Sequence, residues 1–358
     1  WRLAAERAAR GERGGWYRLA HLLMRRPIPV AVAVTALLVV LGLPFLGIRF
    51  TGVDASVLPP GTSSRIVDQV VTSEFPASAA SPAYALLEHT TATQASAYAA
   101  RVRALPDAAL VRPPRLLGPG TYEVQASSGR PFLAPGSQRL VREMRALPPR
   151  PPVGGSTAQY LDQKQTVGAD LPLAIGLLCA ATFVLLYAAT RSLILPLKAL
   201  VMNLLTLSAA FGILVFIFQN GRLQGLLDYR SQGAIELTQP VVLFAIAFGL
   251  STDYGVFLLT RIREAWESGL PNREAVAIGL ERTGRIITAA ALLFCIAVGS
   301  FATSQIILVK EIGIGIALAV LIDASLVRAL LVPALMALLG RWNWWPRGRN
   351  RQIPAPPV

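Results

Sequence analysis

Six long apolar runs, separated by short or polar segments, dominate the hydropathy pattern of this 358-residue chain. Each run approaches or exceeds the ~20 apolar residues with which a helix crosses the hydrocarbon core of a bilayer. Pro172, Pro196 and Pro333 fall near the ends of runs, where a missing backbone N–H is least costly. The pattern predicts transmembrane helices over residues 28–48, 171–190, 193–218, 240–260, 286–303 and 312–339.

The segments between the runs are unequal in length. Residues 49–170 separate the first two runs and contain turn-rich stretches such as LPPGTSS and SSGRPFLAPGSQ. Their periodicity predicts helices over 63–75, 94–105 and 137–147 and strands over 83–88 and 121–126. We therefore expect an all-α membrane bundle with an α+β domain inserted after its first helix. A Pro- and Gly-rich linker at 148–155 returns the chain to the membrane.

The distribution of basic residues predicts the orientation of the spans. Arginines gather in residues 1–27, in a segment at 261–285 and in the tail at 340–358. With these three segments on the cytoplasmic side, as the positive-inside rule requires, residues 49–170 and the loop at 219–239 lie on the opposite, extracytoplasmic side. The basic, amphipathic start of the chain suits a membrane surface.

Composition narrows the class further. The chain is 53% hydrophobic and only 15% charged, which is too apolar for an ordinary soluble protein of this length. Its net charge of +14 is explained by the cytoplasmic arginines, so we do not expect a nucleic-acid partner. The two histidines lack metal-ligand spacing, and we predict neither a metal site nor a cofactor. We interpret Cys179 and Cys295, both inside apolar runs, as packing residues.

Two acidic residues lie inside predicted spans, and they are the strongest candidates for function. Asp253 lies roughly 20 Å and Asp323 roughly 16 Å from the outer ends of their helices, at 1.5 Å per residue. A carboxylate at such depth is expensive unless it is paired, hydrated or protonated, so it marks a functional site by default. A buried carboxyl group that takes up and releases a proton as its surroundings change can drive a pump.

Two neighbours of these acids have open interpretations. Arg328 follows Asp323 by five residues, and it either pairs with that acid or extends its charge to the membrane interface. Tyr254 follows Asp253 directly, but it points 100° away around the helix. Its hydroxyl therefore serves another helix, or the ring is an ordinary interfacial aromatic.

Four glycines lie near the two acids and could allow close helix packing. They are Gly249, Gly255, Gly313 and Gly315. Small residues let membrane helices approach one another closely. Taken singly they are a weak signal in a chain this rich in alanine and glycine.

Several of these motifs together resemble one family. The segments GLSTDYGVFLLTRIRE, ERTGRIITAAALL and LIDASLVRALLVPALMALLGRWNWWP are similar to the MMPL (mycobacterial membrane protein large) branch of the resistance-nodulation-division (RND) transporters. The start RRPIPV and the stretch VDASVLPPGTSSR agree with that resemblance, which covers nearly the whole chain.

The resemblance implies a tandem architecture. Family members contain two halves, each with one span, a porter-type domain and five more spans, and this chain resembles the C-terminal half. By resemblance, Asp253 and Tyr254 form half of a proton relay, and Asp323 and Arg328 support it. Because only one Asp-Tyr pair is present, we expect a longer protein, starting before Trp1, or another protomer, as in a homo-oligomer, to supply the second.

The resulting hypothesis is proton-motive-force-driven export of a lipid or other hydrophobic compound across the bacterial inner membrane. Its partners are protons, membrane lipids and the hydrophobic substrate. Two alternatives remain open. One is a sterol-sensing or protein-export accessory protein of the same fold, and the other is an intramembrane aspartyl protease. The protease lacks support from a Gly-x-Gly-Asp motif.

Overall fold

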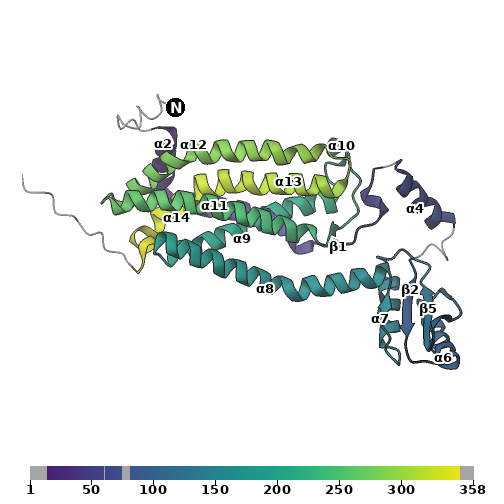
Figure 1. The fold of residues 1–358 in the computed structure, drawn as a ribbon. Helices are drawn as coiled ribbons and strands as arrows, with labels where there is room; N and C mark the ends of the chain where they lie inside the picture. Colours follow the sequence, from purple (N-terminus) through teal and green to yellow (C-terminus); the bar gives the residue numbers. More distant parts are fainter. Residues whose placement is uncertain (1–13, 60, 75–80, 347–358) are drawn as a thin grey trace, which may run out of the picture. The chain divides into compact units, whose positions relative to one another are not determined.

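The computed structural model describes residues 14–59, 61–74 and 81–346, which form two compact units (Figure 1). The chain leaves the first unit after Phe50 and re-enters it at Ala174. We call the first the helical unit and the second the inserted unit. The predicted segment 1–27 and the predicted tail 340–358 are covered only in part, because residues 1–13 and 347–358 lie outside the described ranges.

Six helical stretches of the described chain are long and apolar enough to cross a membrane. This result confirms the six predicted spans, and the mean hydropathy of the best window in each is at least 1.9. The stretches comprise α3 (Pro27–Gly42) with η1 (Leu43–Gly47), α8 (Ser156–Thr190), α9 (Ile194–Leu214) with η3 (Val215–Gln219), α11 (Gln239–Glu267), α12 (Asn272–Gly299) with η4 (Ser300–Thr303), and α13 (Ile307–Ile322) with η5 (Asp323–Leu331), α14 (Val332–Leu339) and η6 (Gly340–Trp344).

Within the predicted loop over 261–285, only residues 268–271 interrupt the helices. Two ion pairs along α11 stabilise its charged end: Arg261 contacts Glu264 and Arg263 contacts Glu267, each at 2.7 Å. Such i,i+3 and i,i+4 pairs support a helix in water. Hydropathy ends a predicted span at the first charges, whereas the helix itself continues past them.

The expected start of the second span is also corrected. The α8 helix begins at Ser156 rather than at residue 171, so Pro172 lies inside it. Similarly, α13 begins at Ile307, five residues before the predicted start of the last span. This shift brings two charged residues, Lys310 and Glu311, into the helix and into the interior of the protein.

The apolar face of α2 (Gly15–Arg25) packs against protein, where the sequence suggested a membrane surface. Tyr17, Ala20 and Met24 are buried on this face. The Tyr17 hydroxyl donates a hydrogen bond to Glu274 of α12 at 2.6 Å, and the His21 ring lies 3.2 Å from the same carboxylate. The helix is therefore anchored to α12 by both apolar and polar contacts.

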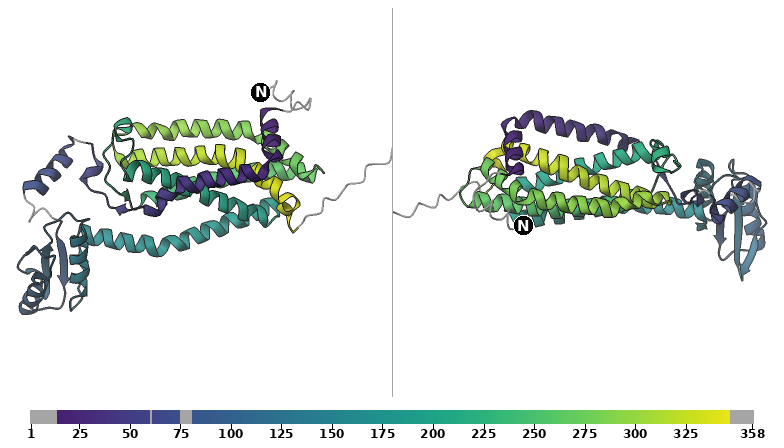
Figure 2. Two further views of the ribbon diagram at one scale, coloured as in Figure 1. Left: turned by 180° about the vertical axis from the view of Figure 1, so that it is seen from behind. Right: turned by 90° about the horizontal axis from the view of Figure 1, so that it is seen from above.

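Helices of the helical unit cross closely where one of them presents a glycine. A Cβ atom added at Gly212 of α9 would lie 2.0 Å from the Leu41 carbonyl oxygen of α3. Figure 2 shows α3, in purple, lying along the bundle. Backbone-to-backbone approach of this kind is typical of membrane helix interfaces.

A short loop region lies at the end of the helical unit nearest Phe50. Here β1 (Phe50–Thr51) pairs with β7 (Ile235–Glu236), and the Ile235 N–H donates to the Arg49 carbonyl at 2.8 Å. The four-residue helix α10 (Gln224–Leu227) lies in the same loop region, between η3 and β7.

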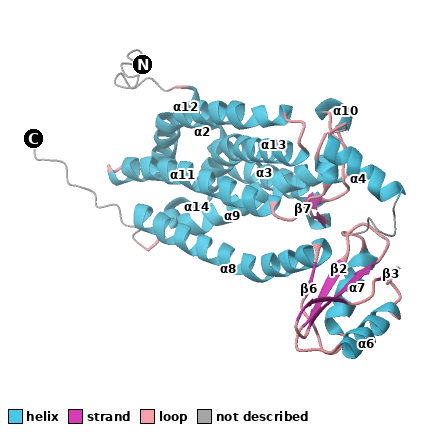
Figure 3. Ribbon diagram, turned by 45° about the vertical axis from the view of Figure 1, so that its right-hand side comes forward, coloured by secondary structure: helices cyan, strands magenta, loops and turns pink. Residues whose placement is uncertain are grey.

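The inserted unit contains helices and a sheet whose described strand pairs are all antiparallel (Figure 3). Its sheet has the order β3-β5-β2-β6, with β4 also paired to β5. The elements are η2 (Ala55–Val57), α4 (Ser63–Glu74), β2 (Ala83–Leu87), α6 (Ala92–Arg103), β3 (Leu110–Val111), β4 (Arg115–Gly118), β5 (Thr121–Ser127), α7 (Pro135–Ala146) and β6 (Val153–Gly154). Phe75, at the end of the predicted helix 63–75, lies outside the described residues.

Alternation of side chains explains the core of the inserted unit. Ala83, Ala85 and Leu87 of β2 point to one face, and Ala85 lies opposite Val124 of β5. Apolar faces of α6 and α7, including Tyr98 and Met144, cover that face. The strands β2 and β5 were predicted, whereas β3, β4 and β6 are too short to show a period of two.

Candidate functional site

A buried ion pair lies in the middle of the last span. The Arg328 Nε donates to Asp323 Oδ2 at 2.6 Å, and each side chain is only 6% exposed. Both residues belong to η5, a π-helical stretch. Its i→i+5 repeat brings residues five apart onto the same face, and such stretches are frequent at functional sites. The structure thus favours pairing over extension of Arg328 to the interface.

Further hydrogen bonds connect this ion pair to two other spans. The Arg328 guanidinium donates to the backbone carbonyl of Ser251 in α11. Ser251 Oγ in turn donates to Asn203 Oδ1 of α9 at 2.7 Å. Because both residues are also buried, one polar network joins α9, α11 and η5. A buried charge is stable only when it is paired and hydrogen-bonded in this way.

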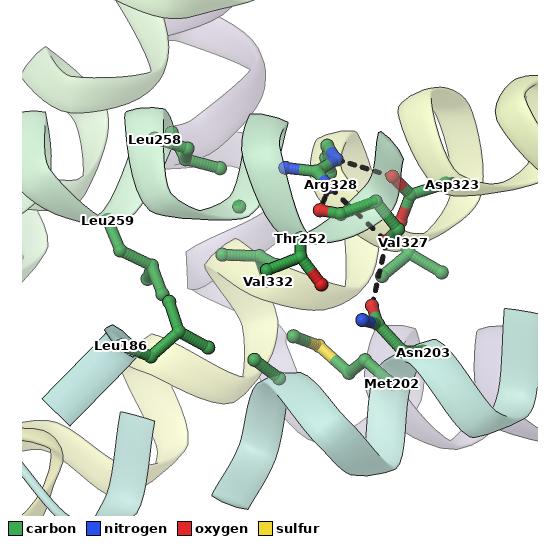
Figure 4. Close-up of a pocket in the computed structure, with 13 residues that line it drawn as sticks. Leu186, Met202, Asn203, Thr252, Leu258, Leu259, Asp323, Val327, Arg328 and Val332 are labelled. Carbon is green, nitrogen blue, oxygen red and sulfur yellow. Dashed lines mark hydrogen bonds and ion pairs between the residues drawn. The ribbon is translucent and has the colours of Figure 1, made fainter. Parts of the chain in front are cut away.

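A cavity of about 30 Å³ adjoins the network, with Asp323, Arg328, Asn203 and Ser251 in its wall. Figure 4 shows Asp323 and Arg328 pointing toward each other at one end of this cavity. The volume is sufficient for one or two water molecules. Asp323 Oδ1 is buried and accepts no hydrogen bond from the described protein atoms, so the pair keeps one acceptor for a proton or a donor.

The structure brings Tyr254, and not Asp253, to the ion pair. The Arg328 Cζ lies 5.7 Å from the centre of the Tyr254 ring, within the range of a cation–π contact. Asp253 is exposed on another face of α11. In the described part of the chain, no hydrogen bond or ion pair reaches its carboxylate. The two predicted relay residues therefore face different surroundings.

The four predicted packing glycines differ in what surrounds them. A Cβ atom at Gly313 would lie 2.5 Å from the Phe301 Cβ, and one at Gly315 would lie 2.8 Å from a Leu214 methyl group. At Gly255 the nearest atoms are Arg328 nitrogens at 3.7 and 3.8 Å, so its bare backbone lies beside the guanidinium. A Cβ atom at Gly249 would meet no atom of another described element within 4 Å, so no close helix packing occurs there.

Asn203 was not predicted as a site residue. Its signal was a lone amide side chain within an apolar run, the same kind of signal that identified Asp253. Among the residues that the structure describes, no group of three or more His, Cys, Asp or Glu side chains is arranged to hold a metal ion.

A second polar network explains the closing NWW motif. Asn343 is fully buried, and its amide donates to the carbonyls of Met336 at 2.9 Å and Gly340 at 2.7 Å. Its side-chain oxygen accepts from the buried Lys198 ammonium at 3.3 Å, and its carbonyl accepts from Ser192 Oγ at 2.6 Å. We call these contacts the Asn343 network. They connect the end of the last span to the start of α9.

The ring of Trp344 extends this network to α11 and α12. It stacks on Trp266 with the ring centres 4.4 Å apart, and its indole N–H donates to Asn272 at 3.1 Å. The exposed Trp342 makes no comparable buried contact.

The six spans, with a polar network buried among three of them, define a multi-pass membrane protein with a charged site inside its helical bundle. Comparison with known proteins identifies which kind. The MMPL family model matches residues 139–357, so the chain belongs to the MMPL family of the RND superfamily, as its motifs suggested.

Individual relatives agree with this assignment. A putative membrane protein of Streptomyces coelicolor is 42% identical over 332 residues, which are 92% of this chain and 46% of the relative. The trehalose monomycolate exporter MmpL3 of Mycobacterium tuberculosis is 34% identical, over 95% of this chain and 38% of its own length. The heme uptake protein MmpL11 of the same organism is also 34% identical, over 95% and 37%. The chain thus spans less than half of each of these relatives.

Proposed function

We propose that the chain forms one membrane half of a transporter that exports a lipid or other hydrophobic compound, driven by the proton-motive force. Support for a hydrophobic substrate comes from the relatives, whose names describe an exporter of trehalose monomycolate and a heme uptake protein. The protein lies in the bacterial inner membrane, with both ends of the chain in the cytoplasm. The inserted unit is the extracytoplasmic, porter-type domain that handles substrate.

One observation carries the proton-driven mechanism. Asp253 lies within a membrane span and faces away from the interior of its own bundle, whereas Tyr254, one residue later, packs over Arg328. A bare carboxylate facing lipid is unfavourable, so Asp253 requires a partner surface. The relatives are more than twice as long as the matched region, which is consistent with a second set of spans that covers it.

In this mechanism the two acids have different roles. Asp253 binds and releases the transported proton at the interface between the two sets of spans. Asp323 and Arg328 form a fixed pair that holds the Tyr254 ring, and with it the local face of α11, in position. When Asp253 binds a proton it loses its charge, so the second set of spans no longer has to shield a carboxylate from lipid. Alternating protonation therefore changes how the halves pack.

The test uses the gene product that contains this chain, expressed in a strain from which its own gene is deleted. Asp253→Asn is expected to reach the membrane in normal amounts, to abolish complementation, and to make the untransported lipid accumulate in a lipid profile. Substrate-dependent proton efflux from everted vesicles should stop as well. Asp68→Asn, on the exposed face of α4, is the matched control and should behave as wild type. Normal lipid transport by Asp253→Asn would refute the relay assignment.

A further inference from the structure

A second pair of charged residues is buried at the beginning of α13, in the helical unit. Lys310 and Glu311 are each only 3% exposed, and they are adjacent in the sequence. The Lys310 ammonium donates to two backbone carbonyls, those of Leu227 and of Asp228, the latter at 2.9 Å. Both carbonyls lie at the end of α10, so Lys310 fastens this short helix to α13. Lys310 has no ion pair with a carboxylate among the described residues.

A second buried acid, Glu236, accepts several hydrogen bonds. Its Oε2 accepts from the backbone N–H of Thr238 at 2.9 Å and of Gln239 at 3.1 Å, as well as from the Thr238 hydroxyl. These donors lie at the N-terminus of α11, where unpaired N–H groups and the helix dipole favour a negative charge. Hydrogen bonds to the charged form stabilise it. Glu236 is therefore supplied with the donors that a carboxylate needs.

Glu311 has the opposite surroundings. Its Oε2 is buried and receives no hydrogen bond from the described residues, and neither does the buried Oε1 of Gln239. Gln239 is fixed beside α13, because its Nε2 donates to the Leu308 carbonyl at 2.9 Å, one turn before Glu311. Glu311 Oε2 of α13 and Gln239 Oε1 of α11 are thus two buried acceptors without a donor near the first turn of α13. Buried acceptors without a donor are rare and call for an explanation.

We propose that Glu311 is a proton-binding site, separate from Asp253 and Asp323, and that it holds one proton while α10 is fastened to α13. A proton on Glu311 turns its unpartnered carboxylate oxygen into a hydrogen-bond donor. Gln239 Oε1, on the neighbouring helix α11, is an acceptor that has no donor among the described residues. The site needs no metal and no organic ligand, and its ligand is the proton itself. It lies twelve residues before Asp323, roughly 18 Å along the helix at 1.5 Å per residue.

Charge balance supports this assignment. The charge of Glu236 is near enough to act on Glu311, and two neighbouring buried carboxyl groups do not both ionise readily. With Glu311 neutral, the single positive charge of Lys310 balances that of Glu236. Tyr229 also faces the cluster, and burial raises the pKa of its hydroxyl to about 12, so that it stays neutral. The Asp228 side chain is exposed to solvent.

The backbone of α10 suggests what the proton controls. Leu223 and Asp228, at its two ends, have φ angles of +62° and +47°, which non-glycine residues adopt rarely. Such strain persists only while other contacts hold the segment in place. A negative charge on Glu311 would leave two buried carboxylates, those of Glu236 and Glu311, against the one Lys310 ammonium, which disfavours the arrangement in which Lys310 holds the Leu227 and Asp228 carbonyls. Loss of the proton is therefore expected to release α10.

The proposal can be tested on the purified intact protein in lipid nanodiscs by infrared spectroscopy, which separates protonated from ionised carboxyl groups. We expect a protonated-carboxyl band at pH 7 that Glu311→Gln removes and that the control Glu264→Gln, at an exposed ion pair, retains. A band that is absent at pH 7, or unchanged in Glu311→Gln, overturns the proposal. A band that sodium ions remove at constant pH also overturns it, because the site would then bind a metal cation.

A second variant keeps the test decisive if Glu311→Gln does not fold. Glu236→Gln removes the neighbouring negative charge, so the titration midpoint of the Glu311 band should fall by about one pH unit or more. An unchanged midpoint contradicts the proposal. The protection of residues 223–229 from hydrogen exchange, corrected for the intrinsic pH dependence of exchange, should fall above that midpoint in the wild type and stay constant in Glu311→Gln. None of these measurements requires transport, so they stand or fall independently of the role of Asp253.

Discussion

Arg328 stacks its guanidinium over the Tyr254 ring at 5.7 Å while its Nε is hydrogen-bonded to Asp323. One cation therefore contacts an aromatic ring of α11 and a carboxylate of its own helix. The residue before Tyr254 is Asp253, so this contact lies one residue from the exposed acid. Under the proposed function, the ion pair positions the neighbouring face of α11.

The first prediction concerns the ion pair itself. Asp323→Asn leaves the Arg328 charge buried without its partner and is expected to lower the free energy of unfolding by about 3–5 kcal/mol. Thermal unfolding in detergent measures the loss. The double variant Asp323→Leu/Arg328→Met removes both charges and should recover most of the stability but no transport. A double variant as unstable as Asp323→Asn would contradict this explanation.

The second prediction separates the ring of Tyr254 from its hydroxyl. Tyr254→Phe keeps the cation–π contact and should retain stability, whereas Tyr254→Leu should lose about 0.5–2 kcal/mol. Transport measured alongside shows whether the hydroxyl takes part in proton transfer, in which case Tyr254→Phe is inactive although stable. Equal stability of the Phe and Leu variants would show that the Arg328 contact contributes nothing.

The third prediction uses two glycines of the helical unit. Gly313→Ala places a methyl group 2.5 Å from the Phe301 Cβ and 2.8 Å from the Val298 carbonyl oxygen, so a shift of α13 is unavoidable. We expect a loss of about 1–3 kcal/mol in thermal unfolding. Gly176→Ala in α8, where the added Cβ atom meets no atom within 4 Å, is the control and should stay within about 0.5 kcal/mol. A larger loss in Gly176→Ala than in Gly313→Ala would contradict the packing argument.

The fourth prediction concerns Tyr98 in the inserted unit, whose hydroxyl donates to the Met144 carbonyl at 2.8 Å. Burial raises the pKa of Tyr98 to about 12, an effect that nearby Arg101 partly offsets. Because the folded protein favours the neutral phenol, this contribution to stability is complete below pH 10 and is lost as the pH rises from 10 to 12.

Tyr98→Phe should cost about 1 kcal/mol near neutral pH, because it leaves a buried carbonyl without its donor. It should also weaken the alkaline loss of protection. Hydrogen exchange of residues 83–146 in the intact protein measures both effects. An identical alkaline profile in the variant would show that another group is responsible.

The sequence was sufficient to identify the six spans and the family, because long apolar runs and contiguous motifs can both be recognised without knowledge of tertiary contacts. It was insufficient for the direction in which Asp253 points. The span around it is apolar on all sides, so hydropathy places the acid in the membrane without assigning it a face. The same limit applies to Arg328, whose pairing depends on a π-helical stretch that no periodicity of the sequence shows.

The charged residues at the span ends show a different limit. Lys310 and Glu311 precede residue 312, where hydropathy begins the last span, so the prediction left them outside it, whereas tertiary contacts bury both. Likewise, Arg261 to Glu267 were assigned to a loop because hydropathy records only their charge. Their ion pairs, which keep α11 helical, depend on side-chain spacing rather than on hydropathy.

The Asn343 network also has a consequence for the order in which the contacts form during synthesis. Ser192 and Asn343 are 151 residues apart, and at about 5–20 residues per second the ribosome takes roughly 8–30 s to connect them. Until then, the Lys198 ammonium sits in the third span without the amide that later accepts its hydrogen bond. A nascent chain stopped before Asn343 therefore lacks both the acceptor for the Lys198 ammonium and the contact that connects the last span to the start of α9.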